Sequence, residues 1–207
     1  MNSPHQIKTI DKFKESILTE KKSTFIAQVY SASSEGEVKG YLSKAKKKYY
    51  NASHHCFAYK FSDGYNRYSD AGEPSGTAGV RILNAIDHFE LTNQLVIVIR
   101  FFGGVKLGVG PLGKAYYLSA HKVLSESKIV TKQLFQKVKI KSEFDHVDIV
   151  HRILSRYNSI IVSTDYQNEI KFSCLIKLIE IDSISQKLAK LAKNNIIITR
   201  FQEFVYK

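Results

Sequence analysis

The stretch LVIVIRFFGGVKLGVGPLGKAY, residues 95–116, joins three kinds of local sequence in succession. Residues 95–102 are almost all apolar, which is typical of a strand buried at the centre of a sheet. Four glycines follow, and they permit backbone conformations that other residues avoid: Gly103, Gly104, Gly108 and Gly110. Pro111 then suits the first turn of a helix that we expect to end near Glu126. The stretch therefore predicts a buried strand, a glycine-rich loop and a helix.

The glycines also match two phosphate-binding patterns, G-x-G-x-x-G from Gly108 to Gly113 and G-x-x-x-x-G-K from Gly108 to Lys114. A P-loop needs a hydroxyl directly after its lysine to hold magnesium, whereas this chain has Ala115. Pro111 also removes one of the backbone N–H groups that would surround a phosphate. The dinucleotide pattern needs its first glycine directly after the strand and an acidic residue about 20 residues later, and neither condition is met. The sequence therefore predicts no bound nucleotide and no cofactor.

Two explanations of the glycine loop remain open. Arg100 precedes the loop, Lys106 lies within it and Lys114 follows it. These basic side chains and the start of the helix favour an anion-binding site. Alternatively, the glycines serve only the tight crossover from strand to helix.

The sequence before this stretch predicts further elements of an α/β domain. They are a strand over residues 22–32, a helix over 35–50 and a second strand over 54–61. A loop over residues 63–79 and a helix from there to about Phe89 follow. Ser33 or Ser34 is placed to cap the first of these helices. The loop is assigned from its many Gly, Asp and Ser residues, and long loops in compact domains are often functional.

The pattern changes after Thr131. The predicted order begins with a strand over residues 133–142, a helix over 145–157 and a hairpin of two strands over 160–178. A helix over residues 182–194 and a strand over 196–207 follow. Asp182 is expected to cap the second helix. This β-α-β-β-α-β order is that of a ferredoxin-like domain. The predicted fold class is therefore α+β with two domains, residues 1–131 and 132–207.

Basic residues outnumber acidic ones in both predicted domains. The 207-residue chain has 31 Lys and Arg against 19 Asp and Glu, a net charge of +12. The counts are 18 against 11 through Thr131 and 13 against 8 after it. This balance favours an anionic partner such as RNA or a ribosome, although lysines can also act only as solubilising groups. The sequence has no apolar run of the length that a membrane span needs and no apolar leader, so we expect a cytoplasmic protein without a membrane partner.

Three stretches resemble the signature of a known family. They are KSTFIAQV (22–29), NASHHCFAYKF (51–61) followed by SDAGEPSGTAGVRIL (69–83), and VIVIRFFGGVKLGVGPLGKAY (96–116). Together they are similar to the IMPACT (YigZ) family, also called UPF0029. The resemblance implies an N-terminal ribosomal-protein-S5-domain-2-like α/β domain and a C-terminal domain similar to the last domain of elongation factor G. Both folds occur in translation machinery, and eukaryotic members restrain a starvation-responsive initiation-factor kinase by competing for its activator protein.

The first hypothesis that this resemblance supports is a non-catalytic, translation-linked regulator or binding protein. Its expected partners are RNA, a ribosome or a translation-regulatory protein. Lys46, Lys47 and Lys48 lie beside Tyr49 and Tyr50 and are candidates for nucleic-acid contact, although a lysine run at a helix end is also typical of a solvated face.

The second hypothesis is a hydrolase-like enzyme acting on a small anionic substrate. Asp70 or Glu73 would act as a general base and His54 or His55 as an acid, with the basic side chains and glycine amides as a clamp. Alternatively, Asp70 serves a turn and Ser75 or Thr77 caps the next helix.

A metal site is not predicted. On a strand, His54 and Cys56 share one face while His55 points away, and no second pair of ligands at suitable spacing is present. The complete set of candidates for anion or partner binding is His54, His55, Asp70, Glu73, Arg100, Gly103, Gly104, Lys106, Gly108, Gly110 and Lys114.

Overall fold

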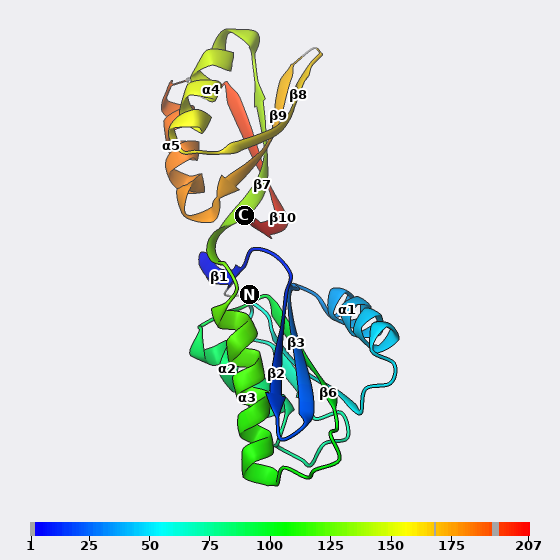
Figure 1. Cartoon of the computed structure of the whole chain (residues 1–207). Coiled ribbons are helices and arrows are strands. Elements are labelled where there is room, and N and C mark those ends of the chain that lie inside the picture. Colours follow the sequence, from blue (N-terminus) through cyan, green and yellow to red (C-terminus); the bar gives the residue numbers. More distant parts are fainter. Residues whose placement is uncertain (1–2, 168, 192–194) are drawn as a thin grey trace. The chain divides into compact units, whose positions relative to one another are not determined.

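The computed structural model describes residues 3–167, 169–191 and 195–207. The chain divides into two compact units, Met1–Thr131 and Lys132–Lys207, each with its own helices and strands (Figure 1). Among the described residues, two five-stranded sheets together with helices confirm the predicted α+β class. The end of the helix predicted for residues 182–194 and Asn168 in the predicted hairpin lie outside the described residues. No helix within the described ranges is long and apolar enough to cross a membrane.

The first unit is built on a five-stranded sheet with the order β2-β3-β6-β4-β5 and antiparallel neighbours. Its elements are β1 (Gln6–Ile10), β2 (Lys14–Glu20), β3 (Ser23–Ser31), α1 (Glu35–Lys48), β4 (His54–Lys60), β5 (Asn66–Ser69), α2 (Gly79–His88), β6 (Gln94–Phe101) and α3 (Val109–Ser125). The central position of β6 confirms the prediction made from its apolar sequence.

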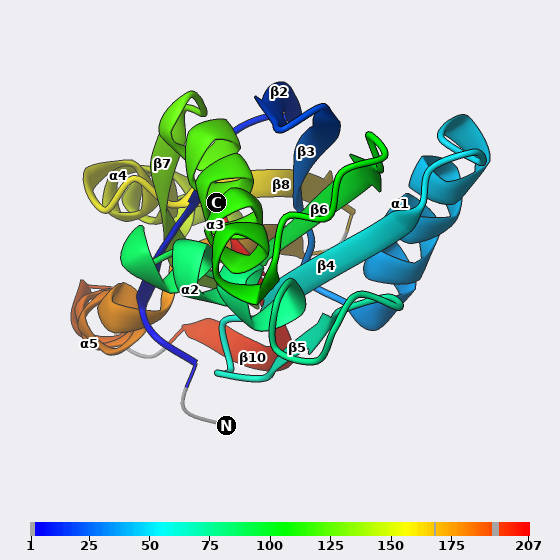
Figure 2. The same cartoon turned by 60° about the horizontal axis from the view of Figure 1, so that its bottom comes forward.

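Helices cover both faces of this sheet, and this explains why β6 is apolar from Leu95 to Ile99. Val96 and Val98 belong to a core shared with α2 and α3. Leu95 and Ile97 belong to a second core, on the opposite face, to which α1 contributes. Figure 2 shows α1 on one side of β4 and β6 and the other two helices on the opposite side. Since neither face of β6 meets water, alternating polar residues would leave unpaired groups in a core.

Two features of the first unit differ from the prediction. The loop predicted for residues 63–79 contains the short strand β5, which pairs with β4 and occupies the edge of the sheet. Its residues Asn66, Arg67 and Tyr68 are exposed, so they carry none of the apolar alternation that identifies a half-buried strand. The second feature is the β2–β3 hairpin, whose turn residues Lys21 and Lys22 have positive φ angles. Of this hairpin, only β3 was predicted.

N-terminal capping residues were predicted for three helices, α1, α2 and α5, and one of these predictions is confirmed. Ser34 caps α1 as expected, because its hydroxyl oxygen accepts the Glu37 N–H at 3.3 Å. Ser75 and Thr77 do not cap α2, which begins at Gly79, and that prediction is wrong. Asp182 is not the cap of α5 either, because the helix already begins at Ile181 and the Asp182 carboxylate pairs with Arg200. In both cases the true helix start lies at a residue that has no capping side chain.

The second unit has the predicted ferredoxin-like order. Its elements are β7 (Ile129–Ser142), α4 (Val147–Arg156), β8 (Ile160–Tyr166), β9 (Ile170–Lys177), α5 (Ile181–Leu191) and β10 (Ile196–Tyr206), with short 3-10 turns at Phe144–His146 and Leu178–Glu180. The sheet has the order β1-β7-β9-β8, so it also includes β1, and β10 pairs with β7 as well. The β10–β7, β7–β9 and β8–β9 pairs are antiparallel. Cys174 is fully buried on the core face of β9, as its alternation with apolar neighbours predicts. Because β7 begins at Ile129, the division between the units falls within a strand.

Candidate functional site

A cluster of buried polar side chains occupies one end of the first unit, where the ends of several elements meet. Arg100 comes from the end of β6, Glu73 from the segment between β5 and α2, Tyr116 from α3 and Ser23 from the start of β3. All four residues are buried. Of these, Arg100 and Glu73 are among the residues that the sequence singled out, and the fold brings them together.

Arg100 and Glu73 form an ion pair that is almost entirely removed from water. The Arg100 Nη1 donates to Glu73 Oε1 at 2.7 Å, and the two side chains are only 6% and 4% exposed. The other terminal nitrogen of Arg100 donates to the Ser23 hydroxyl oxygen at 3.2 Å. The guanidinium also lies 5.4 Å from the centre of the Phe25 ring, where the ring face attracts a cation. The charge of each partner is therefore compensated inside the fold.

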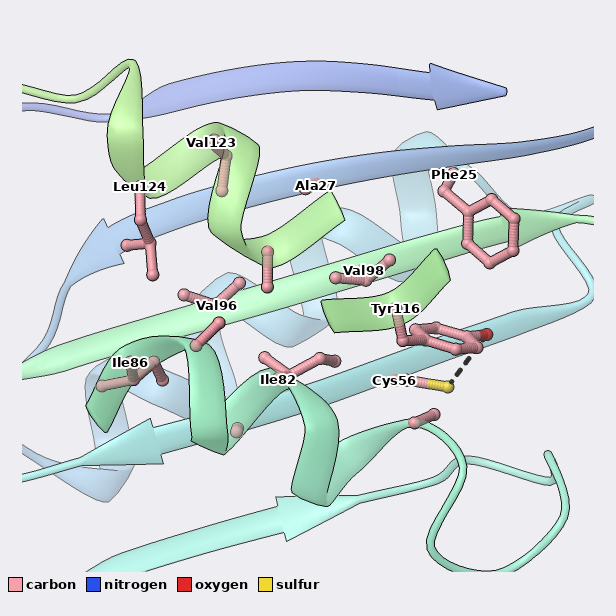
Figure 3. Close-up of a cluster of buried hydrophobic side chains, with 14 of the residues drawn as sticks. Phe25, Ala27, Cys56, Ile82, Ile86, Val96, Val98, Tyr116, Val123 and Leu124 are labelled. Carbon is pink, nitrogen blue, oxygen red and sulfur yellow. Dashed lines mark hydrogen bonds between the residues drawn. The ribbon is translucent and has the colours of Figure 1, made fainter. Parts of the chain in front are cut away.

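Tyr116 and Cys56 extend the cluster into the core beneath α3. The Tyr116 hydroxyl donates to Glu73 Oε1 at 2.7 Å. The Cys56 thiol lies 3.3 Å from the Tyr116 oxygen (Figure 3). It also lies 3.0 Å from the carbonyl oxygen of Asp70. Burial raises the pKa of the Cys56 thiol to about 12 and also raises the pKa of Tyr116. Because the thiolate is the reactive form, Cys56 is not suited to nucleophilic chemistry at neutral pH.

The two histidines lie on opposite faces of β4, as predicted. The His54 Nδ1 is 3.0 Å from the Ala71 carbonyl oxygen, and its Nε2 is 3.8 Å from Glu73 Oε2. The His55 ring faces the other side of the sheet, and burial lowers its pKa. Among the described residues there is no group of three or more His, Cys, Asp or Glu side chains that could hold a metal ion.

Asp70 has a structural task at the start of α2. Its carboxylate accepts the backbone N–H groups of Gly76, Ala78 and Gly79 at 2.8–2.9 Å. Burial acts to raise the pKa of Asp70, but these three donors outweigh it, so the net pKa is lowered from its ordinary value. The Asp70 carbonyl oxygen accepts the N–H of Glu73 at 2.9 Å, which closes a turn. Asp70 therefore supports the turn and the helix, and its carboxylate faces backbone donors.

The glycine loop also has a structural explanation. A Cβ atom on Gly103 would lie 2.0 Å from the carbonyl oxygen of Lys22, so only glycine fits beside the β2–β3 hairpin. Gly108 has a φ of +85° directly before α3, a conformation that other residues rarely adopt. Gly110 is different, because an added Cβ would meet no atom within 4 Å. In the spacing that resembles a phosphate-binding pattern, Gly108 is thus required by its backbone conformation, whereas packing does not require Gly110.

The sequence did not single out two adjoining pockets at the first turns of α3. One has a volume of about 380 Å³ and is lined by Arg81, Asn84, Gly110, Gly113, Lys114 and Tyr117. The other has a volume of about 450 Å³ and is lined by Leu18, Thr19, Glu20, Lys21, Gly110, Pro111, Lys114, Ala115 and Leu118. The sequence held one signal that could have located the pockets: residues 110, 113, 114 and 117 are spaced so that they share one face of a helix. The remaining candidates lie elsewhere, with Lys106 exposed in the loop and Lys46–Lys48 exposed at the end of α1.

The sequence of the first unit matches a known domain family. A model of the Impact N-terminal domain matches residues 21–124. The chain belongs to the IMPACT family. An IMPACT family member of Haemophilus influenzae is 31% identical over 185 residues, which cover 86% of this chain and 88% of that relative. The IMPACT family member YvyE of Bacillus subtilis is 29% identical over 189 residues, covering 90% and 87%.

The fold also has a counterpart among solved structures. A crystal structure described as that of a hypothetical protein superposes with a TM-score of 0.71 and covers 97% of this chain and 99% of its own. The identity between the two sequences is 22%, so this likeness concerns the fold alone.

Proposed function

We propose that this IMPACT-family protein is a non-catalytic binding protein that acts in translation in the cytoplasm. Its partner is RNA, the ribosome or a translation-associated protein, contacted through basic surface residues. The observation that carries the proposal is the contrast between buried and exposed cations. Arg100 is neutralised inside the fold, whereas Lys46, Lys47, Lys106 and Lys114 are exposed and form no ion pair with any residue that the structure describes.

The groups that an enzyme would need are engaged in holding the fold. Glu73 would have to accept a proton, but one oxygen of its carboxylate is shared by Arg100 and Tyr116. Asp70 faces three backbone donors, and Cys56 holds its proton at neutral pH. This arrangement supports a structural role for the cluster and favours binding over hydrolysis.

Binding to ribosomes across a range of salt concentrations tests the proposal. If about four to six basic side chains neutralise phosphates, log K falls linearly with log salt, at about 0.7 to 0.9 per contact. We expect cosedimentation with ribosomes at low salt and a steep loss toward physiological salt. No cosedimentation even at low salt would contradict contact with RNA or ribosomes.

A pair of triple variants asks whether the end of α1 takes part. Replacing Lys46, Lys47 and Lys48 with Gln should reduce the salt slope by about two to three contacts. The matched control replaces the same three residues with Arg, which keeps the charge and should keep the slope. Equal slopes for both triple variants would place the contact surface away from α1. Lys48 is expected to contribute least, because it lies 3.3 Å from the Glu15 carboxylate.

A further inference from the structure

The two pockets at the start of α3 adjoin each other, because Gly110 and Lys114 line both of them. We define the α3 groove by these two pockets. On one side it is bordered by the β2–β3 hairpin with Lys21, and on the other by α2 with Arg81 and Asn84. Its two pockets therefore lie along the first turns of α3, one toward the β2–β3 hairpin and the other toward α2.

Three basic side chains are distributed along this groove. Lys21, Lys114 and Arg81 come from three different elements, and all three residues are exposed. None of them forms a hydrogen bond or an ion pair with another residue in the described part of the chain. Glu20 is the acidic residue among those that line the groove. The three cations therefore outnumber the one acidic residue of the groove, and none of them is paired with it.

The walls of the groove are set by close packing. A Cβ atom on Gly113 would lie 3.3 Å from the Arg81 Nε, so this glycine lets the arginine stem lie against α3. Tyr117, on the same helix face, is partly buried and packs against the core below. Its contact with the core limits the positions of the ring, so the groove presents an aromatic side chain and the Asn84 amide beside the cations.

We infer that the α3 groove binds a single strand of RNA, with Lys21, Lys114 and Arg81 contacting successive backbone phosphates. This inference rests on the proposed function and assigns the surface that carries it. Proteins that bind single strands combine a basic groove that follows the backbone with aromatic side chains near the bases. A groove that spans three elements and carries a cation at each fits a strand better than an isolated phosphate group. Tyr117 and Asn84 supply contacts to a base at the Arg81 end.

Gly110 allows the groove to be blocked without disturbing the fold. It is the second residue of α3, has no positive φ, and an added Cβ would enter open space. Gly110→Glu places a carboxylate beside Lys114, where it repels phosphate and competes for the cations. Replacing glycine with a better helix former and adding a negative charge in the first turn both favour the helix. We therefore expect unchanged or higher thermal stability together with binding at least about tenfold weaker.

Gly36→Glu is the matched control. Gly36 is the second residue of α1, also has no positive φ, and a Cβ there would make only an ordinary contact of 3.9 Å. The variant changes net charge by the same amount but lies on the helix that covers the opposite face of the sheet. We expect its affinity to stay within about twofold of the unmodified protein.

The probe is a fluorescent oligouridylate of about ten nucleotides, followed by anisotropy in the full chain over a range of salt. Arg81→Gln combined with Lys114→Gln should lower the salt slope by about 0.7 per lost contact, a readout that does not depend on Gly110.

If the unmodified protein binds but Gly110→Glu behaves like Gly36→Glu, the groove assignment is wrong and the proposed function stands. If the unmodified protein does not bind the oligouridylate at low salt, the groove assignment is overturned, and the ribosome experiment then decides the proposed function separately. If uridine monophosphate, or polyglutamate of matched charge, displaces the oligouridylate as well as unlabelled oligouridylate does, the groove binds a small phosphate or any polyanion. Either result would also overturn the inference.

Discussion

At the scale of single residues, Glu73 and Arg100 show that a buried charge needs a partner that compensates for its removal from water. Removing either ion from water costs several kcal/mol, and only mutual attraction with further hydrogen bonds offsets that cost. Glu73→Gln takes away the negative partner and leaves the guanidinium buried. We expect the free energy of unfolding to fall by about 3–5 kcal/mol, measured by urea denaturation.

The matched control for this prediction is Glu90→Gln. Glu90 is an exposed carboxylate that pairs with Lys8 at the surface, where water replaces the lost contact. We expect no measurable change in the urea midpoint of this variant. A Glu73→Gln protein as stable as the control would show that the cluster does not hold the fold, and the carboxylate would again be available for chemistry.

The members of the cluster could be recognised from sequence only one by one. Arg100 attracts attention because it ends an apolar strand, and Glu73 because it lies in a long polar segment. Their pairing depends on how the segment after β5 returns to the end of β6, which no local pattern encodes. Tyr116 was missed because an aromatic residue on a helix is typical of ordinary core. Arg81 and Tyr117 were missed because each is unremarkable until α2 and α3 lie together.

At the scale of elements, α2 depends on a carboxylate that lies nine residues before its first residue. Asp70 accepts three backbone N–H groups at this helix start, so Asp70→Asn weakens the cap. We expect a loss of about 0.5–2 kcal/mol in unfolding free energy at neutral pH. The folded-state pKa of Asp70 is lowered, so its contribution is complete above the ordinary value of 3.8 and is lost as pH falls through the folded value.

The difference between Asp70→Asn and the unmodified protein should therefore shrink in strongly acidic solution. Urea denaturation at about pH 7 and about pH 3 measures it. Asp87→Asn, near the other end of the same helix, is the control, because the Asp87 carboxylate makes only a surface ion pair with Lys60 and gains nothing from the helix dipole. A loss that does not depend on pH, or an equal loss in the control, would contradict capping by the Asp70 carboxylate.

Elements whose residues face a core were predictable, whereas edge strands were predicted unevenly: β8 was predicted, and β2 and β5 were not. β6 is recognisable as an apolar run because both of its faces are buried, and β9 is recognisable by alternation because one of its faces is buried. β5 has no such signal because it is an exposed edge strand held by hydrogen bonds to β4. The caps of α2 and α5 were assigned from nearby Ser, Thr and Asp residues. The α2 cap was missed because the true donor–acceptor contact spans a turn that only the fold creates.

At the scale of the whole molecule, the division at Thr131 predicts two units that fold separately. The paired residues of β7 with β9 run from Phe135 to Ser142, and those with β10 run from Leu134 to Ser142. A cut after Thr131 therefore removes none of these pairs, although it does remove β1, which also pairs with β7. The core of the second unit also consists of residues from Val138 to Ile196. We expect a protein of residues 132–207 to be folded and to unfold cooperatively in urea.

A shorter protein of residues 143–207 is the control for this prediction. It lacks the part of β7 that pairs with both neighbouring strands and supplies Val138 and Ile140 to the core. Without that central strand, β9 and β10 would each present an unpaired edge and an uncovered apolar face, so we expect an unfolded chain. Circular dichroism and the dispersion of amide resonances distinguish the two outcomes. If residues 132–207 are as unfolded as the control, the second unit depends on the first, and the division at Thr131 separates two halves of one cooperative fold.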